Sequence, residues 1–277
     1  MIKILYDQHI HSSFSNDSHE DLRNYYENAK EQGIEYVITT EHCDFLSSVD
    51  NTDWMPDFDK LISYQKELDK DYPMVKSLLG LELGYKKDYL KEMNEISHKY
   101  NFDLIQLSIH DGPKGDYYFT STFERDPIGM MHYYFDAMVE ALNSFSNFDV
   151  LSHIDFGFKT IVKINPNYKF SLFEERIREV LKILISLDKT LEINSKVLEL
   201  LNNEYMKNDK NYQYDDHLRY LLSIYKECGG KKLTLSSDAH KVSKYKLDFD
   251  RHIGVIKEMG FNKLSYFIKR KEYFYNI

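Results

Sequence analysis

Short apolar stretches alternate along the chain with longer amphipathic ones, and this pattern predicts strands separated by helices. Buried strands are typically four to eight mostly apolar residues long. Seven such stretches occur, at residues 2–9, 36–40, 77–83, 104–109, 150–153, 190–194 and 232–237. Between them, apolar residues recur at helical spacing over residues 21–32, 58–70, 87–100, 127–144, 172–187 and 215–227. Gly33 follows the first of these segments and is expected to end it as a C-cap.

This order of elements predicts an α/β fold built on a parallel sheet, because repeated strand–helix–strand units connect parallel strands. Seven strands fit a closed or nearly closed barrel, and an open doubly wound sheet is the alternative. Nothing resembling a GxGxxG motif follows the first strand, so a dinucleotide-binding fold has little support. A chain of 277 residues, 42% of them hydrophobic, is predicted to form a single domain over residues 1–277.

The charge balance bears on the possible partners. The chain has 36 Lys and Arg against 45 Asp and Glu, a formal net charge of −9, which argues against binding to nucleic acid. The first residues lack the apolar core of a signal peptide, and no apolar run approaches the length that spans a bilayer. Cys43 and Cys228 form no metal-binding motif and are expected to be reduced thiols. We therefore predict a cytoplasmic protein with no membrane partner, its oligomeric state left open.

Metal-binding side chains gather at the predicted strand ends. In order along the chain they are His9, His11, His42, Glu82, His110, His153, Asp238 and His240. All strands of an α/β barrel direct their carboxyl ends to the same face, so these side chains are expected to meet there. A single histidine beside an apolar stretch is more often structural, but the joint pattern indicates a metal site.

The types of ligand narrow the choice of metal. Mixtures of imidazole and carboxylate suit zinc, manganese or iron rather than calcium, which prefers oxygen ligands alone. The set is larger than one ion needs, and a carboxylate such as Glu82 can bridge two ions. Paired ions activate water and stabilise the oxygens of an in-line displacement. The sequence therefore predicts two or three divalent ions (Zn, Mn or Fe) in a hydrolase that acts on phosphate esters.

Six motifs resemble the polymerase and histidinol phosphatase (PHP) family, and within it the monofunctional histidinol-phosphatase branch. They are DQHIHSSFSND, TTEHCDF, LGLELGY, FDLIQLSIH, LSHIDF and SSDAH, and they run in family order from residue 7 to residue 240. The resemblance thus covers nearly the whole chain. It implies a distorted (β/α)7, TIM-like barrel with the metal site at the C-terminal ends of the strands.

The resemblance also implies how nine ligands are shared among three ions. By motif, the first ion is assigned to His9, His11, Glu82 and Asp238, the second to Glu82, His110 and His153, and the third to Asp17, His42 and His240. Many relatives have histidine where Asp17 stands, but aspartate is also a sound ligand. Catalysis is assigned to Glu82, Asp238 and His240.

Contacts to the substrate are expected from residues near the same strand ends. Relatives often hold the substrate phosphate with an arginine after the HID-type motif, and here Lys159 is the first candidate and Lys163 the second. Lysine neutralises phosphate but does not form the bidentate fork of arginine. Glu192 and Asn194 alternate on one strand and are expected either to orient ligands or substrate, with Asn194 as the substrate contact, or to be structural. Asp155 could assist proton transfer or bind substrate, but a solvent-facing loop position is favoured.

The resemblance implies an enzyme of histidine biosynthesis that hydrolyses L-histidinol phosphate to L-histidinol and phosphate. One alternative is another PHP phosphoesterase that acts on a nucleotide or a different small phosphate ester. The other is a PHP module that binds metal without catalysis, against which the complete ligand set argues. In each enzymatic case the partner is a small phosphorylated substrate.

Overall fold

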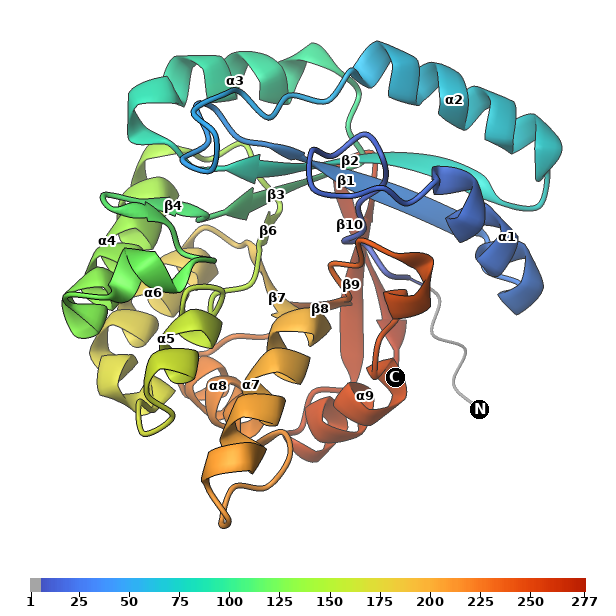
Figure 1. Cartoon of the computed structure of the whole chain (residues 1–277). Helices are drawn as coiled ribbons and strands as arrows, with labels where there is room; N and C mark the ends of the chain where they lie inside the picture. The colour runs from blue at the N-terminus through green and yellow to red at the C-terminus, as the bar shows by residue number, and fades with distance from the viewer. Residues whose placement is uncertain (1–5) are drawn as a thin grey trace.

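The computed structural model describes residues 6–277, and its central feature is a six-stranded parallel sheet. The sheet has the strand order β1-β2-β3-β6-β7-β8, so neighbours in the sheet are also neighbours along the chain, as repeated βα units require. The strands are β1 (Tyr36–Cys43), β2 (Lys76–Gly84), β3 (Leu104–Ser108), β6 (Val150–Leu151), β7 (Thr190–Asn194) and β8 (Leu233–Ser236). The sheet curls, and the helices lie around its outside (Figure 1).

Six of the seven predicted strands correspond to the strands of this sheet, and β7 has the predicted bounds. The predicted first strand begins within residues 1–5, which lie outside the described residues, and residues 6–9 form no strand. An α/β fold with a curled parallel sheet is therefore confirmed. A count of seven strands is not.

The segment that contains His9 and His11 lies between the two edge strands of the sheet. Ile10 forms a parallel bridge with Ala239, which follows β8, and the backbone N–H of His11 donates to the Ala239 carbonyl at 2.8 Å. On the other side, the N–H of Thr40 in β1 donates to the Ile10 carbonyl at 2.9 Å. This segment thus links β8 to β1 and brings two histidines to the strand ends.

Nine α-helices occur among residues 6–277, and six of them were predicted from the apolar spacing. These six are α1 (Leu22–Gln32), α2 (Phe58–Asp71), α3 (Leu90–Lys99), α4 (Pro127–Ser144), α6 (Glu174–Ser186) and α8 (Asp216–Glu227). The other three are α5 (Phe158–Ile164), α7 (Ser195–Asn208) and α9 (Phe249–Glu258). Gly33 ends α1 with φ 62°, which confirms the predicted C-cap. Across the described residues, no helix has both the length and the apolar character needed to span a membrane.

Shorter elements complete the chain. Single turns of 3-10 helix are η1 (Lys87–Tyr89), η2 (Thr120–Phe123), η3 (Phe170–Phe173) and η4 (Val242–Lys244). Two antiparallel hairpins pair β4 (Asp111–Gly112) with β5 (Gly115–Asp116), and β9 (Lys263–Ile268) with β10 (Lys271–Asn276). The first hairpin follows β3 at the end of the sheet where the predicted ligands lie.

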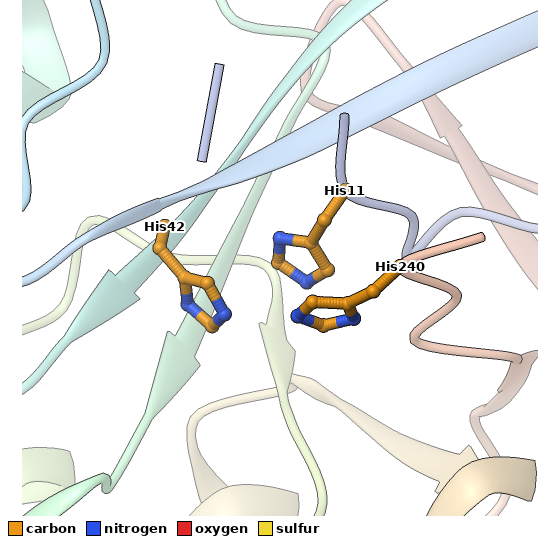
Figure 2. Close-up of side chains that lie close together, drawn as sticks. All are labelled: His11, His42 and His240. Atoms are coloured by element: carbon orange, nitrogen blue, oxygen red, sulfur yellow. The ribbon is translucent and has the colours of Figure 1, made fainter. Parts of the chain in front are cut away.

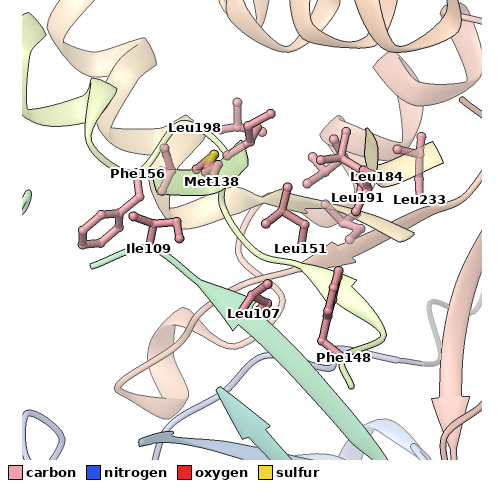
Figure 3. Close-up of a cluster of buried hydrophobic side chains, with 14 of the residues drawn as sticks. Leu107, Ile109, Met138, Phe148, Leu151, Phe156, Leu184, Leu191, Leu198 and Leu233 are labelled. Atoms are coloured by element: carbon pink, nitrogen blue, oxygen red, sulfur yellow. The ribbon is translucent and has the colours of Figure 1, made fainter. Parts of the chain in front are cut away.

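The hydrophobic core fills the space between the sheet and the surrounding helices. Leu107, Leu151 and Leu191 come from three neighbouring strands and pack in one buried cluster with Met138 of α4 and Leu184 of α6 (Figure 3). Burying each side chain of this size stabilises the fold by roughly 1.5–3 kcal/mol. The core holds the strands rigidly, so the polar residues at their ends are held at fixed separations.

The C-terminal hairpin is fastened to the chain's first described residues by an amide side chain. Gln8 is buried, and its Nε2 donates to the Phe267 carbonyl at 2.8 Å while its Oε1 accepts from the Phe267 N–H at 2.7 Å. The side chain of Gln8 therefore takes the place that a neighbouring strand would have beside β9.

This pairing predicts a loss of stability for Gln8→Leu, because the substitution leaves a buried N–H and a buried carbonyl of Phe267 without partners. We expect the free energy of unfolding to fall by about 2–4 kcal/mol, measured by urea denaturation. Gln32→Leu, at an exposed position of α1, is the control and should change it by no more than about 0.5 kcal/mol. Equal stability of the two variants would contradict the structural role of Gln8.

Candidate metal centre

Glu82, near the end of β2, lies at the centre of the predicted ligands. Its carboxylate is fully buried, and five imidazole nitrogens lie 2.8–3.4 Å from its two oxygens. These nitrogens belong to His9, His11, His42, His110 and His153. One carboxylate therefore faces histidines from four separate parts of the chain.

Asp238 approaches this group from the loop after β8. Its Oδ1 lies 3.3 Å from His11 Nε2 and 3.9 Å from His9 Nε2. The backbone of Asp238 has φ 52°, a left-handed conformation that residues other than glycine seldom adopt. Backbone strain of this kind gathers at functional sites, where the surrounding structure holds it in place.

A second part of the site is formed by three histidine rings and one aspartate. The rings of His11, His42 and His240 point toward one another (Figure 2), and the centre of the His11 ring lies 4.1 Å and 4.2 Å from the other two. Asp17 Oδ2 is 2.9 Å from His240 Nε2 and 3.6 Å from His42 Nε2. The three residues assigned to a third ion thus lie together.

Four groups of three residues place their ligand atoms within 4.8 Å of one another, close enough to share an ion. The groups are His9–His11–Glu82, His9–His153–Asp238, His42–Glu82–His110 and His11–His42–His240. They contain eight of the nine predicted ligands, and Asp17 contacts two of these eight. Because His11 and His42 each belong to two groups, the assignment of ligands to individual ions stays a prediction.

Several of the converging atoms are buried without a hydrogen-bond partner among the described residues. They are His9 Nε2, His11 Nε2, His42 Nδ1 and Glu82 Oε2. Buried polar atoms in folded proteins nearly always have partners. Imidazole and carboxylate atoms that meet in this way fit a divalent cation, which would bind all of them at once.

The electrostatics of the site also favour a cation. Burial lowers the pKa of His9, but the carboxylates of Glu192, Glu82 and Asp238 outweigh it and raise that pKa well above its ordinary value. Burial also lowers the pKa of His42, but the carboxylates of Glu82 and Asp17 outweigh it and raise that pKa to about 10. The buried carboxylates are thus stabilised by nearby positive charge. Divalent ions supply this charge and bind the imidazoles in their neutral form.

Glu192 of β7 fixes the orientation of His9. Its Oε1 lies 2.7 Å from His9 Nδ1, which leaves His9 Nε2 facing Glu82, and its Oε2 accepts the backbone N–H of His153 at 2.8 Å. A carboxylate behind a metal-binding histidine sets the tautomer and increases the basicity of the ring. The buried Glu192 therefore supports two predicted ligands at once.

Asn194 lies beside Glu192 and is held by contacts within the protein. Its Nδ2 is 3.2 Å from Glu192 Oε2 and 3.5 Å from Asp238 Oδ2, and its Oδ1 accepts the N–H of Val197 as the N-cap of α7. The side chain does not line the cavity described below. Its assignment as a substrate contact stays a prediction, and its observed contacts are structural.

Asp44 fixes the orientation of the His110 ring, as Glu192 does for His9, and it was not predicted from the sequence. Asp44 Oδ1 lies 2.8 Å from His110 Nδ1, so the other ring nitrogen faces Glu82. A Cβ atom on Gly84 would lie 1.7 Å from Asp44 Oδ1, so this contact requires glycine at the end of β2. The position of Asp44, two residues after His42, was the available signal.

A third buried carboxylate, Glu41, holds the loop that carries His11. It accepts hydrogen bonds from the N–H of Ser12 and from the hydroxyls of Ser12 and Ser15. The Ser15 hydroxyl in turn lies 3.2 Å from His11 Nδ1. The serines of the motif HSSFS thus connect a ligand to a buried carboxylate on the neighbouring strand.

A cavity of about 380 Å³ opens over these residues, and two lysines line it together with six predicted ligands. Lys159 is only 1% exposed, and its Nζ lies 3.5 Å from the centre of the Phe156 ring. Burial and the nearby Lys196 lower the pKa of Lys159 to about 7. An anion bound beside this lysine would raise its pKa and favour its charged form. Lys163 is exposed and does not line the cavity.

Lys196, at the start of α7, was missed by the sequence reasoning. Its Nζ lies 3.3 Å from Asp238 Oδ1 and 3.1 Å from His240 Nδ1. Its position two residues after the predicted strand at residues 190–194 was the available signal. The expectation for Asp155 was wrong, since that residue is buried and its Oδ2 lies 2.8 Å from His217 Nε2.

Comparisons with other proteins bear on this site. The model of the PHP domain family matches residues 7–196. The chain is 28% identical over 264 residues to the histidinol-phosphatase of Lactococcus lactis subsp. lactis, covering 94% of this chain and 93% of the relative. It is also 28% identical over 247 residues to the probable histidinol-phosphatase of Clostridium acetobutylicum, covering 89% of this chain and 90% of that relative.

The fold is likewise similar to a solved structure. The crystal structure of histidinol phosphate phosphatase from Lactococcus lactis subsp. lactis, complexed with zinc, L-histidinol and phosphate, superposes with a TM-score of 0.81. The sequence identity is 25%, and the match covers 96% of this chain and 98% of the solved one.

The contact between Glu192 and His9 predicts a role for Glu192 in metal affinity. Glu192→Gln keeps the shape of the side chain but removes the charge behind His9, so we expect metal affinity to fall about 10- to 100-fold. Metal retention in the presence of a competing chelator measures this change. Glu199→Gln, on the surface of α7, removes the same charge away from the site and should retain metal as the unmodified protein does.

Proposed function

The chain belongs to the PHP domain family, and on this premise we propose that it is a metal-dependent phosphatase that hydrolyses L-histidinol phosphate to L-histidinol and phosphate. The observation that carries the proposal is the convergence of buried histidine and carboxylate atoms beside a cavity lined by two lysines. The relative of the same fold that is 25% identical to this chain holds zinc, L-histidinol and phosphate, which supports the same substrate here.

The donor atoms favour two or three divalent ions, with zinc, manganese or iron as the metals that suit imidazole and carboxylate together. Zinc in the Lactococcus lactis structure supports this choice. Glu82 is suited to lie between two ions because its two oxygens face different histidines. Bound ions supply Lewis acidity, which activates water and neutralises charge on the phosphoryl oxygens.

The protein's own side chains hold the phosphate and the ligands in place. Lys159 and Lys196 line the cavity and present two ammonium groups to a phosphate dianion. Because they act as point charges, they neutralise the phosphate without fixing its rotation. Glu192 and Asp44 keep the rings of His9 and His110 in position, so no ligand has to reorient during the reaction.

The fold of this enzyme is proposed to be the distorted (β/α)7 barrel, with the segment at Ile10 closing the sheet and residues 1–277 forming one domain. The position of Ile10 between Ala239 and Thr40 supports closure of the sheet at this point. Closure would bring the ends of β8 and β1 together, where His11, His42 and His240 already meet.

Phosphate release from a panel of monoesters tests the function. We expect L-histidinol phosphate to be cleaved with the highest kcat/KM, ahead of nucleoside monophosphates and phenyl phosphate, and a chelator to abolish the activity until divalent metal is restored. Metal content is measured in the same samples. A preference for a nucleotide would favour a different substrate in the family, and no release from any ester by the metal-loaded protein would favour a non-catalytic module.

The buried position of Lys159 predicts a large effect of Lys159→Met on the reaction. Removing a charge-assisted contact to phosphate should lower kcat/KM about 10- to 100-fold, because such a contact contributes about 1.5–3 kcal/mol. Lys163→Met on the same helix is the matched control, since Lys163 is exposed outside the cavity, and it should leave the kinetics unchanged. Equal effects of the two substitutions would refute the role of Lys159.

A further inference from the structure

Lys159, one of the two lysines that line the cavity, has no partner that holds its charged end. The side chain forms no hydrogen bond or ion pair within residues 6–277, and its Nζ lies 3.5 Å from the centre of the Phe156 ring and 5.1 Å from that of the Tyr118 ring. Lys196, in contrast, has two hydrogen-bonding partners. The position of the Lys159 ammonium group therefore depends on the backbone that carries it.

The helix that carries Lys159 is short and begins without a side-chain cap. α5 has seven residues, and Gly157 at its N-cap has no side chain to bind the free N–H groups of the first turn. Helices of this length are not stable alone, so contacts with the rest of the protein must hold it. The backbone N–H of Lys159 donates to the Asp155 carbonyl at 3.2 Å. The start of α5 thus depends on how Asp155 is held.

Asp155 is held by a histidine from a distant part of the chain. Its Oδ2 lies 2.8 Å from Nε2 of His217 in α8, 62 residues further along, and this is the one hydrogen bond of the Asp155 side chain within residues 6–277. Both residues are buried, with 3% and 4% of their surfaces exposed. A carboxylate accepts and does not donate, so Nε2 of His217 carries the proton of this bond.

The ring of His217 also packs against the first turn of α5. It is stacked on Phe158, with ring centres 5.8 Å apart and planes inclined by 20°, and its centre lies 4.7 Å from that of Phe170 in η3. One side chain of α8 therefore contacts both Asp155 and Phe158, the residues on either side of the turn from which α5 starts.

Stability alone is a weak explanation for a buried pair of this kind. Replacing such a pair with apolar residues of similar size is often neutral or stabilising, and buried polar pairs are better explained by the geometry that they specify. Here that geometry includes Lys159, which follows Asp155 by four residues and lines the cavity. His217 does not line this cavity, so any effect that it has on a bound phosphate is indirect.

We propose that His217 is a positioning residue for the reaction: through Asp155 it fixes the start of α5, so that the ammonium group of Lys159 meets the substrate phosphate. The inference rests on the proposed function, in which Lys159 neutralises the phosphate. Displacing a positioned group by about 1 Å can lower a rate on the order of 100-fold, even when the change is made away from the chemistry.

The first test is His217→Phe, which keeps a flat ring on Phe158 and removes the hydrogen bond to Asp155. The inhibition constant of inorganic phosphate on the metal-loaded protein should rise about tenfold, and by no more than it rises in Lys159→Met. His217→Gln is the conservative variant, because its amide N–H can replace the lost donor, and it should restore most of the phosphate affinity. An unchanged inhibition constant in His217→Phe would overturn the proposal.

His252→Phe is the matched control, because the chain holds a second buried contact between histidine and aspartate. His252 of α9 is fully buried, its Nε2 lies 3.5 Å from Asp215 Oδ1, and neither residue lines the cavity. We expect this substitution to lower stability and to leave the inhibition constant of phosphate unchanged. An equal rise in both variants would show a general effect of destabilisation and would overturn the role of His217.

A double-mutant cycle separates positioning of Lys159 from an effect on another part of the site. In the Lys159→Met background, His217→Phe should cause no further rise in the inhibition constant, because the group that His217 positions is absent. Its effect on the free energy of unfolding should persist in that background. A further rise as large as in the unmodified protein would refute the coupling to Lys159.

Chemical labelling measures the position of Lys159 without any activity. Because Lys159 is only 1% exposed, its amine should react slowly with acetic anhydride, and His217→Phe should raise the rate of acetylation about tenfold by opening this part of the structure. Mass spectrometry of the metal-loaded protein measures the rate, which should not change in His252→Phe.

The labelling result also distinguishes this inference from the proposed function. If the protein does not cleave L-histidinol phosphate but labelling changes as expected, the proposed substrate is wrong and the positioning role is supported. Unchanged labelling would overturn the positioning role even in an active phosphatase. If His217→Phe does not fold, Asp155→Asn replaces it, because a neutral amide forms a weaker hydrogen bond with His217. Both readouts should then change in the same direction by about threefold, and no change would refute the proposal.

Discussion

The buried carboxylate of Glu82 is the constraint on which the rest of the site depends. A buried charge without compensation is very unfavourable, so the surrounding structure must supply positive charge or a cation. The register of the sheet places one imidazole beside this carboxylate, since His42 of β1 pairs directly with Glu82 of β2. The segment that precedes β1 adds His9 and His11, and the segments after β3 and β6 add His110 and His153, around the same two oxygens. Groups from distant parts of the chain converge because parallel strands end on one face.

An imidazole has two nitrogens, and only one of them faces the centre of this site. The outward nitrogen needs a partner of its own, and buried carboxylates supply it directly to His9 from Glu192 and to His110 from Asp44. Each such contact fixes the ring plane and the tautomer, so the inward nitrogen keeps its lone pair for a metal. The rings of these predicted ligands are therefore already oriented for an ion, and ion binding requires little reorganisation.

The sequence was sufficient to predict where the strands end and which side chains meet there, because strands have a short apolar signature and their ends share one face. It was insufficient for α7, which begins at residue 195 directly after β7 and was not among the predicted helices. Lys196 follows the predicted strand by two residues, but a single lysine there is not a metal ligand and was not singled out. Contacts such as His9 with Glu192, 183 residues apart, follow from the closure of the sheet and leave no local pattern.

The overall charge of the protein makes the local arrangement necessary. With a formal net charge of −9, the chain repels a phosphate dianion at long range. Screening limits this repulsion to about 8 Å at physiological ionic strength, so the binding energy must come from groups inside the cavity. The two lysines that line the cavity supply positive charge at this short range. A ligand that also carries an ammonium group has a smaller net negative charge and meets less repulsion, so the acidic surface itself favours amine-bearing phosphate esters over bare ones.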